Sequence, residues 1–135
     1  MVKLKDVIEV LDIYSGDVEG FFQFYFNLKT DKFIYSSIDS GADDEYLYDD
    51  EELYLPFYHE IYSSQIINAF IESIQDFGIQ DHMFQIFNGR GKYHRIKEYF
   101  YSAGLIDRYY AFKDAYLKNE AIKWCEDHQI SYIDT

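Results

Sequence analysis

Two runs of aromatic and β-branched residues, joined by a short polar stretch, constrain the fold of this chain more than any other feature. The runs cover residues 21–28 and 32–38 and flank the Lys-Thr-Asp stretch at 29–31. Such runs favour strands, and two of them joined by a few residues predict an antiparallel β-hairpin. Because no glycine occupies the turn, we expect a loop of about three to five residues rather than a tight two-residue turn. The almost wholly aromatic stretch 21–26 predicts a strand that is covered on both faces.

Apolar residues at helical spacing predict helices over most of the remaining chain. We expect a short helix at 3–12, helices at about 63–77 and 79–87 separated by Gly78, and two more at about 91–103 and 107–127. The residues predicted to face inward are Leu4, Val7, Ile8 and Leu11 in the first helix, Ile66, Ile67, Phe70, Ile71, Ile74 and Phe77 in the second, Ile79, Met83, Ile86 and Phe87 in the third, Tyr93, Ile96, Phe100 and Ala103 in the fourth, and Tyr109, Tyr110, Phe112, Tyr116, Leu117, Ala121 and Trp124 in the last.

Local signals also predict where these helices begin and end. Ser63 or Ser64 is the expected N-cap of the second helix. Asn88 and Gly89 can adopt the left-handed conformation that ends a helix. Gly104 is expected just past the end of the fourth helix, with Leu105 returning to contact Phe100 as in a Schellman cap.

Strands early in the chain and helices late predict the α+β class, with an N-terminal helix and an aromatic-rich hairpin packed on a C-terminal group of about four helices. An isolated hairpin is marginal, so we expect it to pack on the helices or to gain an edge strand from residues 53–56, which end at Pro56. The length of 135 residues indicates a single domain over 1–135. Residues 1–56 are expected to hold the helix, the hairpin and an acidic loop, and residues 57–135 to be helical.

Composition limits the compartment and the chemistry. The single cysteine, Cys125, excludes an intramolecular disulfide and a zinc site of several cysteines. The chain starts without the pattern of a cleaved leader, and no apolar run approaches the ~20 residues that span a bilayer. We therefore expect a soluble, cytoplasmic protein that does not bind membranes.

The formal net charge of −13 indicates which partners are unsuitable. Such a charge repels polyanions, so general affinity for nucleic acid or for an anionic membrane is not expected. The charge fits either simple solubility or an electrostatic partner that is basic. The acidic stretch 39–52, which holds eight acids, is expected to be a solvated loop or a recognition loop for such a partner.

One short segment reverses this charge. Residues 90–97 hold four basic residues and no acid. The segment follows a Gly-Arg-Gly stretch at a predicted helix start, where free backbone N–H groups and the helix dipole favour an anion. The candidate residues of an anion-binding or partner-binding site are Gly89, Arg90, Gly91, Lys92, His94, Arg95 and Lys97.

Two other interpretations of this segment are open. The basic residues can belong to a structural helix–helix turn and offset nearby acids, such as those of 39–52. Alternatively, the helices at 79–87 and 92–103 can form a helix-turn-helix in which Arg95 faces a DNA groove, although the net charge opposes this. The pattern is not a phosphate-binding Walker loop, because it lacks the second Gly-Lys-Ser/Thr and a preceding strand.

No catalytic or metal-binding pattern stands out elsewhere. The stretch 39–52 lacks the spacing of a calcium-binding EF-hand. His59-Glu60 lacks the second histidine of a zinc-protease motif, and Cys125 with His128 offers too few ligands for zinc. An enzymatic function is therefore unsupported, and we expect neither a metal nor a cofactor.

Residues 89–130 contain a long pattern of glycine, basic and aromatic residues. It falls on Gly89, Arg90, Gly91, Tyr93, Arg95, Ile96 and Lys97, then on Gly104, Leu105, Tyr109, Tyr110, Phe112, Lys113 and Asp114, and finally on Trp124 and Ile130. This pattern resembles the C-terminal signature of the bacterial Uncharacterised Protein Family 0158. Upstream, the stretch FNLKTDKF is similar to the family's hairpin turn, but Asp31 stands where the family usually has glycine. Likewise, Tyr109 stands at the position of the family's usual tryptophan.

The resemblance implies a bacterial source, a cytoplasmic location and a small stand-alone domain, and it supplies no activity. It directs attention to Arg90, Arg95, Lys97 and Asp114. Asp114 lies on the helix after Arg95 and is a candidate for an ion pair with it, which would explain the motif structurally.

Three functions follow from these observations. The first is a non-enzymatic binding or regulatory module that contacts a protein partner through the basic segment or the acidic stretch. The second is a binder of a phosphate or carboxylate ligand, or an enzyme acting on one, and the third is a nucleic-acid-binding protein. The environment of Arg95, free in a cleft or buried in an ion pair, is the observation that separates them best.

Overall fold

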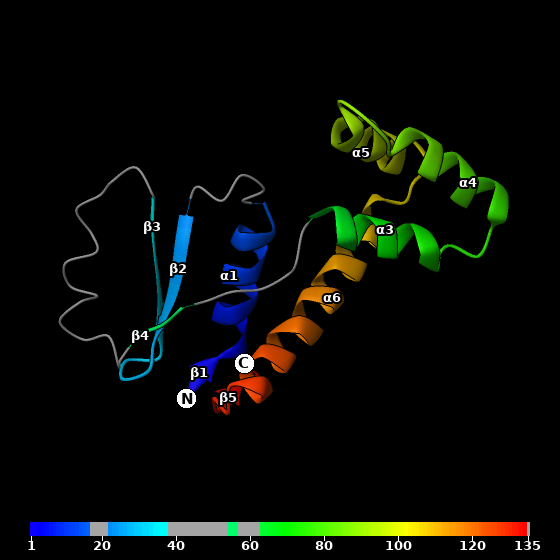
Figure 1. Ribbon diagram of the computed structural model, residues 1–135. Helices are drawn as coiled ribbons and strands as arrows, with labels where there is room; N and C mark the ends of the chain where they lie inside the picture. Colours follow the sequence, from blue (N-terminus) through cyan, green and yellow to red (C-terminus); the bar gives the residue numbers. More distant parts are fainter. Residues whose placement is uncertain (17–21, 38–53, 57–62, 135) are drawn as a thin grey trace. The chain divides into compact units, whose positions relative to one another are not determined.

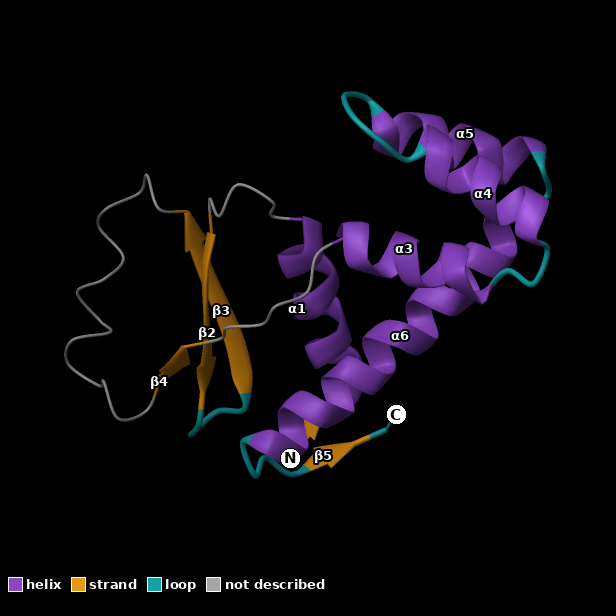
Figure 2. Ribbon diagram, turned by 45° about the vertical axis from the view of Figure 1, so that its right-hand side comes forward, coloured by secondary structure: helices purple, strands orange, loops and turns teal. Residues whose placement is uncertain are grey.

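The computed structural model describes residues 1–16, 22–37, 54–56 and 63–134 and has the predicted α+β class (Figures 1 and 2). The chain divides into two compact units. The first, unit 1, is Met1–Tyr62 together with Lys118–Thr135, and the second, unit 2, is Ser63–Leu117. The stretch 39–52, the predicted acidic loop, lies outside the described residues, as does His59-Glu60.

Unit 1 contains the predicted hairpin. Strands β2 (Phe22–Asn27) and β3 (Lys32–Ser37) pair antiparallel with Asn27 opposite Lys32, and β4 (Tyr54–Pro56) pairs on the other side of β2. The strand order is therefore β3-β2-β4, which confirms the edge strand expected near Pro56. Phe24 and Phe26 are buried and Tyr25 between them is half-buried, so the second face of β2 is only partly covered.

The hairpin turn is closed by asparagine rather than glycine. The side-chain oxygen of Asn27 accepts hydrogen bonds from the backbone N–H groups of Lys29 (2.9 Å) and Thr30 (3.1 Å). Asp31 then takes a left-handed φ of 55° and donates its N–H to the Asn27 carbonyl. Asparagine and aspartate tolerate such local bonding and such a φ, so a four-residue loop forms without glycine.

Helix α1 (Leu4–Gly16) extends the predicted helix by one turn and buries Leu4, Val7 and Leu11 completely, whereas Ile8 is half-buried. Trp124, on the part of α6 (Ile106–Asp127) that belongs to unit 1, lies edge-on to Phe26 with ring centroids 5.4 Å apart. Such aromatic pairs add roughly 0.5–1.5 kcal/mol to the burial of their area.

Unit 1 also contains a second, parallel sheet that no sequence pattern indicated. Strand β1 (Val2–Lys3) pairs with β5 (Tyr132–Ile133), which brings the two ends of the chain together (Figure 1). The turn that leads from α6 to β5 is a Schellman cap in which Gln129 takes the left-handed position with φ 57°. The N–H of Ile130 donates to the Cys125 carbonyl at 2.8 Å and that of Gln129 to the Glu126 carbonyl at 3.1 Å.

Unit 2 consists of α3 (Ser63–Ser73), α4 (Phe77–Ile86), α5 (Lys92–Ser102) and the first half of α6. Its core is an aromatic cluster centred on Phe70, whose ring centroid lies 5.2 Å from that of Phe100, 5.3 Å from Tyr109 and 5.5 Å from Phe112. The turn after α5 is the predicted Schellman cap. Gly104 has φ 71°, and the N–H of Leu105 donates to the Phe100 carbonyl at 2.8 Å. None of the described helices is both long enough and apolar enough to cross a bilayer.

Several residues predicted to face inward lie at the surface instead. Phe77 is 82% exposed, and Ile79, Tyr93, Ala103 and Tyr110 are exposed as well. The predicted helix end at Gly78 is also wrong, because α3 stops at Ser73 and Gly78 lies inside α4. The cause is a helix start that competes with continuation of α3. The Asp76 carboxylate accepts the N–H of Ile79 at 3.0 Å and so begins a new helix.

Candidate functional site

The basic segment forms the turn between α4 and α5, two helices that lie side by side in unit 2 (Figures 1 and 2). We call residues 87–92 the basic turn. Gly89 has φ 74° and Gly91 has φ 77°, so both take the left-handed conformation, whereas Asn88 does not. Gly91 is the N-cap of α5 and has no side chain with which to cap it, so no side-chain oxygen competes for the first N–H groups of that helix.

Arg95, on the first turn of α5, holds the basic turn together. Its Nε donates to the carbonyl oxygen of Ile86 at 3.2 Å and its Nη1 to that of Arg90 at 2.6 Å. Its Nη2 donates to the carbonyl oxygen of Asn88. The planar guanidinium suits this arrangement because its N–H groups point outward in fixed directions. Its positive charge also complements the partial negative charge at the C-terminal end of α4.

The environment of Arg95 is therefore neither of the two alternatives expected from the sequence. Among the described residues its hydrogen bonds all go to backbone carbonyls, and it forms no ion pair with Asp114, which is exposed on α6. The glycine at 91 is part of the same arrangement. A Cβ placed there would lie 3.2 Å from Nη1 of Arg95, so a larger residue would crowd the guanidinium.

The other basic residues of the segment have different surroundings. Lys92 lies with its Nζ 4.8 Å from the centre of the Phe87 ring, a cation–π contact. His94 pairs with Glu98 at 3.0 Å on the exposed side of α5. Arg90 and Lys97 are exposed, and their side chains have no hydrogen bond or ion pair to any other residue that the structure describes. Since five residues do not complete a whole number of helical turns, Lys97 lies on a different side of α5 from Lys92.

The structure therefore brings together only some of the predicted site residues. The basic turn contains Gly89, Arg90, Gly91 and Lys92. Arg95 donates hydrogen bonds to the backbone carbonyls of this turn. His94 and Lys97 lie farther along α5. Arg90 and Lys92 remain as the side chains that can approach an anion.

The charge of the chain is divided unequally between the two units, each of which is defined by its contacts in three dimensions. Unit 2 has six acidic and six basic side chains and is formally neutral, whereas unit 1 has nineteen acidic and six basic ones. The whole net charge of −13 thus belongs to unit 1. The basic turn consequently belongs to a unit without net negative charge.

A second carbonyl-binding side chain occurs at the preceding turn, and sequence reasoning missed it. The side-chain amide nitrogen of Gln80 on α4 lies 3.1 Å from the carbonyl oxygen of Ile71, 3.2 Å from that of Glu72 and 3.4 Å from that of Ile74. The first two carbonyls lie at the C-terminal end of α3 and the third just beyond it, and that of Ile71 also accepts the N–H of Ile74 at 3.1 Å. In the turn between α3 and α4, and again in the turn between α4 and α5, a side chain of the following helix donates hydrogen bonds to backbone carbonyls.

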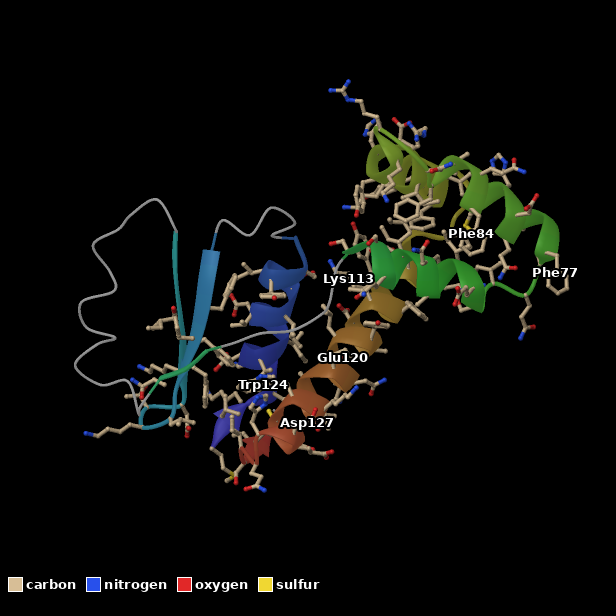
Figure 3. The ribbon with its side chains drawn as sticks, in the orientation of Figure 1. Phe77, Phe84, Lys113, Glu120, Trp124 and Asp127 are labelled. Atoms are coloured by element: carbon tan, nitrogen blue, oxygen red, sulfur yellow. The ribbon has the colours of Figure 1, made fainter. Side chains whose placement is uncertain are left out.

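Sequence reasoning also missed an exposed aromatic edge on α4. Phe77 and Phe84 are seven residues apart and lie on the same side of the helix (Figure 3). They are 82% and 37% exposed. The signal that misled the prediction is the apolar spacing from Ile66 to Phe77, which continues through the break between α3 and α4.

Two further reactive side chains among the described residues, Cys125 and His128, lie near the end of α6. Cys125 is buried, which raises the pKa of its thiol to about 11 and keeps it protonated at neutral pH. His128 lies with its Nδ1 2.9 Å from the Trp124 carbonyl oxygen. The described stretches of the chain contain no group of three or more His, Cys, Asp or Glu side chains that could hold a metal ion.

Unit 1 has an open cleft of about 370 Å³ beside α1 and the hairpin turn. It is lined by the carboxylates of Asp6, Glu9 and Asp31 and by apolar groups that include Phe33. Lys32 also lines this cleft and offsets some of its negative charge.

Comparison of the chain with models of protein families, with curated proteins and with solved structures finds no match. The resemblance to Uncharacterised Protein Family 0158 stays a prediction that rests on the residues of the C-terminal signature.

Proposed function

We propose that this chain is a non-enzymatic binding module that contacts an acidic segment of a partner protein through the basic turn. The observation that carries the proposal is the set of bonds made by Arg95. By tying the carbonyls of Ile86, Asn88 and Arg90 to one guanidinium, it holds the backbone of the turn in a single shape. Arg90 and Lys92 then stand on a preorganised backbone, which lowers the entropy lost on binding.

The start of α5 adds to this positive surface. Its first backbone N–H groups have no side-chain cap, and the helix dipole favours negative charge there by typically about 0.3–1 kcal/mol. A carboxylate that accepts a charge-assisted bond from Arg90 would add roughly 1.5–3 kcal/mol before solvent screening. The neutrality of unit 2 means that no net charge of its own opposes an acidic partner at short range.

A binding role is favoured over catalysis by what surrounds the turn. His94, the histidine closest to it in sequence, is exposed and paired with Glu98 on α5. The buried thiol of Cys125 belongs to unit 1 and is protonated at neutral pH. The proposal includes a cytoplasmic location and membership of the bacterial family that the signature resembles.

The direct test is affinity capture from a bacterial lysate with the intact chain, the double variant Arg90→Glu/Lys92→Glu and a control of equal charge change, Lys5→Glu/Lys123→Glu. Both control lysines are exposed and belong to unit 1. We expect the intact chain and the control to capture the same acidic partner and the Arg90/Lys92 variant to lose it. Capture of the same proteins by all three chains would contradict the proposal.

A small anion is the second candidate, because the uncapped first turn of α5 offers backbone N–H groups of the kind that bind phosphate. Thermal-shift measurements with inorganic phosphate and with citrate test this candidate, and stabilisation that disappears in the Arg90/Lys92 variant would favour it. Short duplex DNA at low salt is the third probe. Retention of DNA would replace the protein partner by nucleic acid.

A further inference from the structure

We infer that Asn88 is a site of spontaneous deamidation, which places a new negative charge inside the basic turn. Asn88-Gly89 is the sole Asn-Gly pair in the sequence, and both residues are exposed between α4 and α5. In this reaction the backbone nitrogen of the following residue attacks the side-chain carbonyl carbon of asparagine. A following glycine hinders that attack least because it has no Cβ and the widest choice of backbone angles.

The geometry at Gly89 leaves its nitrogen available. A Cβ built on this residue would find no atom within 4 Å, so the space around it is open. The Gly89 N–H donates no backbone hydrogen bond within the residues that the structure describes. Its φ of 74° also shows that it has left the hydrogen-bond pattern of α4.

Arg95 favours the attacking form of this nitrogen. Its Nη2 donates to the Asn88 carbonyl, which is the carbonyl of the Asn88–Gly89 peptide bond. A cationic donor on a peptide oxygen withdraws electron density from the whole peptide group, and the N–H of that group becomes more acidic. The nucleophile is the deprotonated nitrogen, so the reaction is expected to accelerate as the pH rises.

The chemistry requires no reagent except water. A solvent base removes the proton from the Gly89 nitrogen, which forms a bond to Cγ of Asn88 while the side-chain nitrogen leaves as ammonia. The resulting five-membered imide is then opened by water at either carbonyl. One opening gives aspartate and the other gives isoaspartate, in which the backbone runs through the former side chain.

The other three asparagines of the chain are protected by their local structure and serve as internal controls. The side-chain oxygen of Asn27 accepts two backbone N–H groups at 2.9 and 3.1 Å. Asn68 in α3 and Asn119 in α6 are followed by residues inside a helix, whose N–H groups are engaged in the helical pattern. Deamidation is therefore expected at Asn88 and not at the other three positions.

The consequence for binding rests on the function proposed above. Conversion adds a carboxylate next to Gly89, Arg90 and Lys92, where it competes with an acidic partner for the same positive charge. Isoaspartate also lengthens the backbone at the carbonyl that Arg95 holds. The converted chain is thus expected to bind an acidic peptide several-fold more weakly, and the modification acts as a slow timer on the basic turn.

The experiment incubates the purified full chain at mildly alkaline pH, in its folded state and in concentrated urea, and follows each asparagine by peptide mapping with mass spectrometry. Asn88 is expected to convert in the folded chain while Asn27, Asn68 and Asn119 stay intact. The variant Asn88→Gln, which cannot form the five-membered ring, is expected to stay unchanged. An Asn88 that converts only in urea, or in neither state, overturns the inference.

A second measurement separates this inference from the proposed function. Binding of a fluorescent oligoglutamate peptide is compared for the intact chain, Asn88→Asp and Arg90→Glu/Lys92→Glu. Weaker binding by both variants supports the timer. If Asn88 converts but Asn88→Asp binds the peptide as tightly as the intact chain, the inferred effect on binding is wrong and the deamidation itself is still supported. If the intact chain does not bind the peptide, the proposed function fails while the mass-spectrometric result is unaffected.

Discussion

The guanidinium of Arg95 donates a 2.6 Å hydrogen bond to the backbone carbonyl of Arg90, five residues earlier in the chain. Two arginines of one short basic segment thus have opposite roles. Arg95 binds the backbone of the turn, and Arg90 is carried by that backbone with its side chain exposed. Some of the positive charge of the segment is therefore structural, and some is available for a ligand.

Replacing Arg95 tests its structural role. Arg95→Lys keeps the charge but cannot reach three carbonyls at once, so we expect a loss of about 1–2 kcal/mol in the free energy of unfolding. Arg95→Met is expected to lose slightly more. Urea denaturation followed by circular dichroism measures both changes. Arg108→Met, at an exposed position of α6, is the control and should stay within about 0.5 kcal/mol of the wild type. Equal stabilities of the Arg95 and Arg108 variants would show that the carbonyl bonds contribute nothing.

The two glycines of the turn provide a matched pair. Both have positive φ, so alanine at either site is expected to cost roughly 1 kcal/mol. Gly91→Ala has an additional cost, because its Cβ would lie 3.2 Å from the Arg95 guanidinium, whereas the Cβ of Gly89→Ala meets no atom within 4 Å. We therefore expect Gly91→Ala to be the less stable variant in the same denaturation experiment. In an Arg95→Met background the difference between the two alanines should disappear.

Gln80 should have a similar role at the preceding turn. Gln80→Ala removes the side-chain donor to the carbonyls of Ile71 and Glu72, of which that of Ile71 keeps the Ile74 N–H, and we expect a loss of about 1 kcal/mol. Gln80→Glu, which keeps the shape but replaces the donor by a carboxylate, is expected to be worse at neutral pH. Gln85→Ala on the same helix removes only an exposed bond to Asp81 and is the control. A Gln80→Glu variant as stable as the wild type would exclude the proposed contact.

The exposed position of Phe77 predicts that its replacement has little effect on the free energy of unfolding. Phe77→Ser is expected to change the free energy of unfolding by less than about 0.5 kcal/mol, because the ring is 82% exposed. Phe70→Ala removes the centre of the aromatic cluster and should cost about 3–5 kcal/mol. Thermal melting of both variants distinguishes a surface phenylalanine from a core one. A large loss for Phe77→Ser would restore the sequence-based prediction that this residue belongs to the core.

Burial of Cys125 predicts a pH dependence of stability. Its pKa is raised to about 11 from an ordinary value of 9.0, so the folded chain keeps the thiol proton where the unfolded chain has lost it. Unfolding then releases a proton above about pH 9, and stability is expected to fall as the pH rises toward about 11, by roughly 2–3 kcal/mol in total. Below about pH 9 this contribution does not change.

The comparison that isolates this thiol is Cys125→Ala, because many tyrosines titrate in the same range. The difference in unfolding free energy between the wild type and this variant should shrink as the pH rises from about 9 to about 11. A difference that stays constant over that interval would mean that the thiol is not protected. In the folded wild type, a thiol reagent should react at neutral pH only after unfolding.

Much of the fold was predictable because short stretches of sequence determine it. The hairpin at 22–37 follows from two aromatic runs, and the Schellman cap at Gly104 follows from one glycine placed after a helical pattern. The helix at Leu4–Gly16 follows from its apolar spacing. The location of the basic turn between two helices was predictable for the same reason. In each case the interacting groups lie within a few residues of one another.

The roles inside the site were not predictable in this way. Arg95 reaches carbonyls five, seven and nine residues earlier, and no pattern in the sequence distinguishes a guanidinium that binds backbone from one that awaits an anion. Phe77 fits the apolar stripe of α3, yet the Asp76 cap starts a new helix and turns its ring outward. Whether α3 continues or a new helix begins at the Asp76 cap depends on packing energies. The spacing of apolar residues gives no information about those energies.

Local sequence is sufficient to specify the helices and the hairpin of this protein, its fold class and the place where its positive charge gathers, because propensity, periodicity and turn chemistry act over one or two turns of chain. Folding in three dimensions was needed to establish which basic residues are free to bind, that the whole net negative charge falls in one compact unit, and that the two ends of the chain pair as β1 and β5. Those outcomes depend on groups brought together from distant or separate helices and strands. Their energies are set by spatial proximity, which the order of residues alone does not specify.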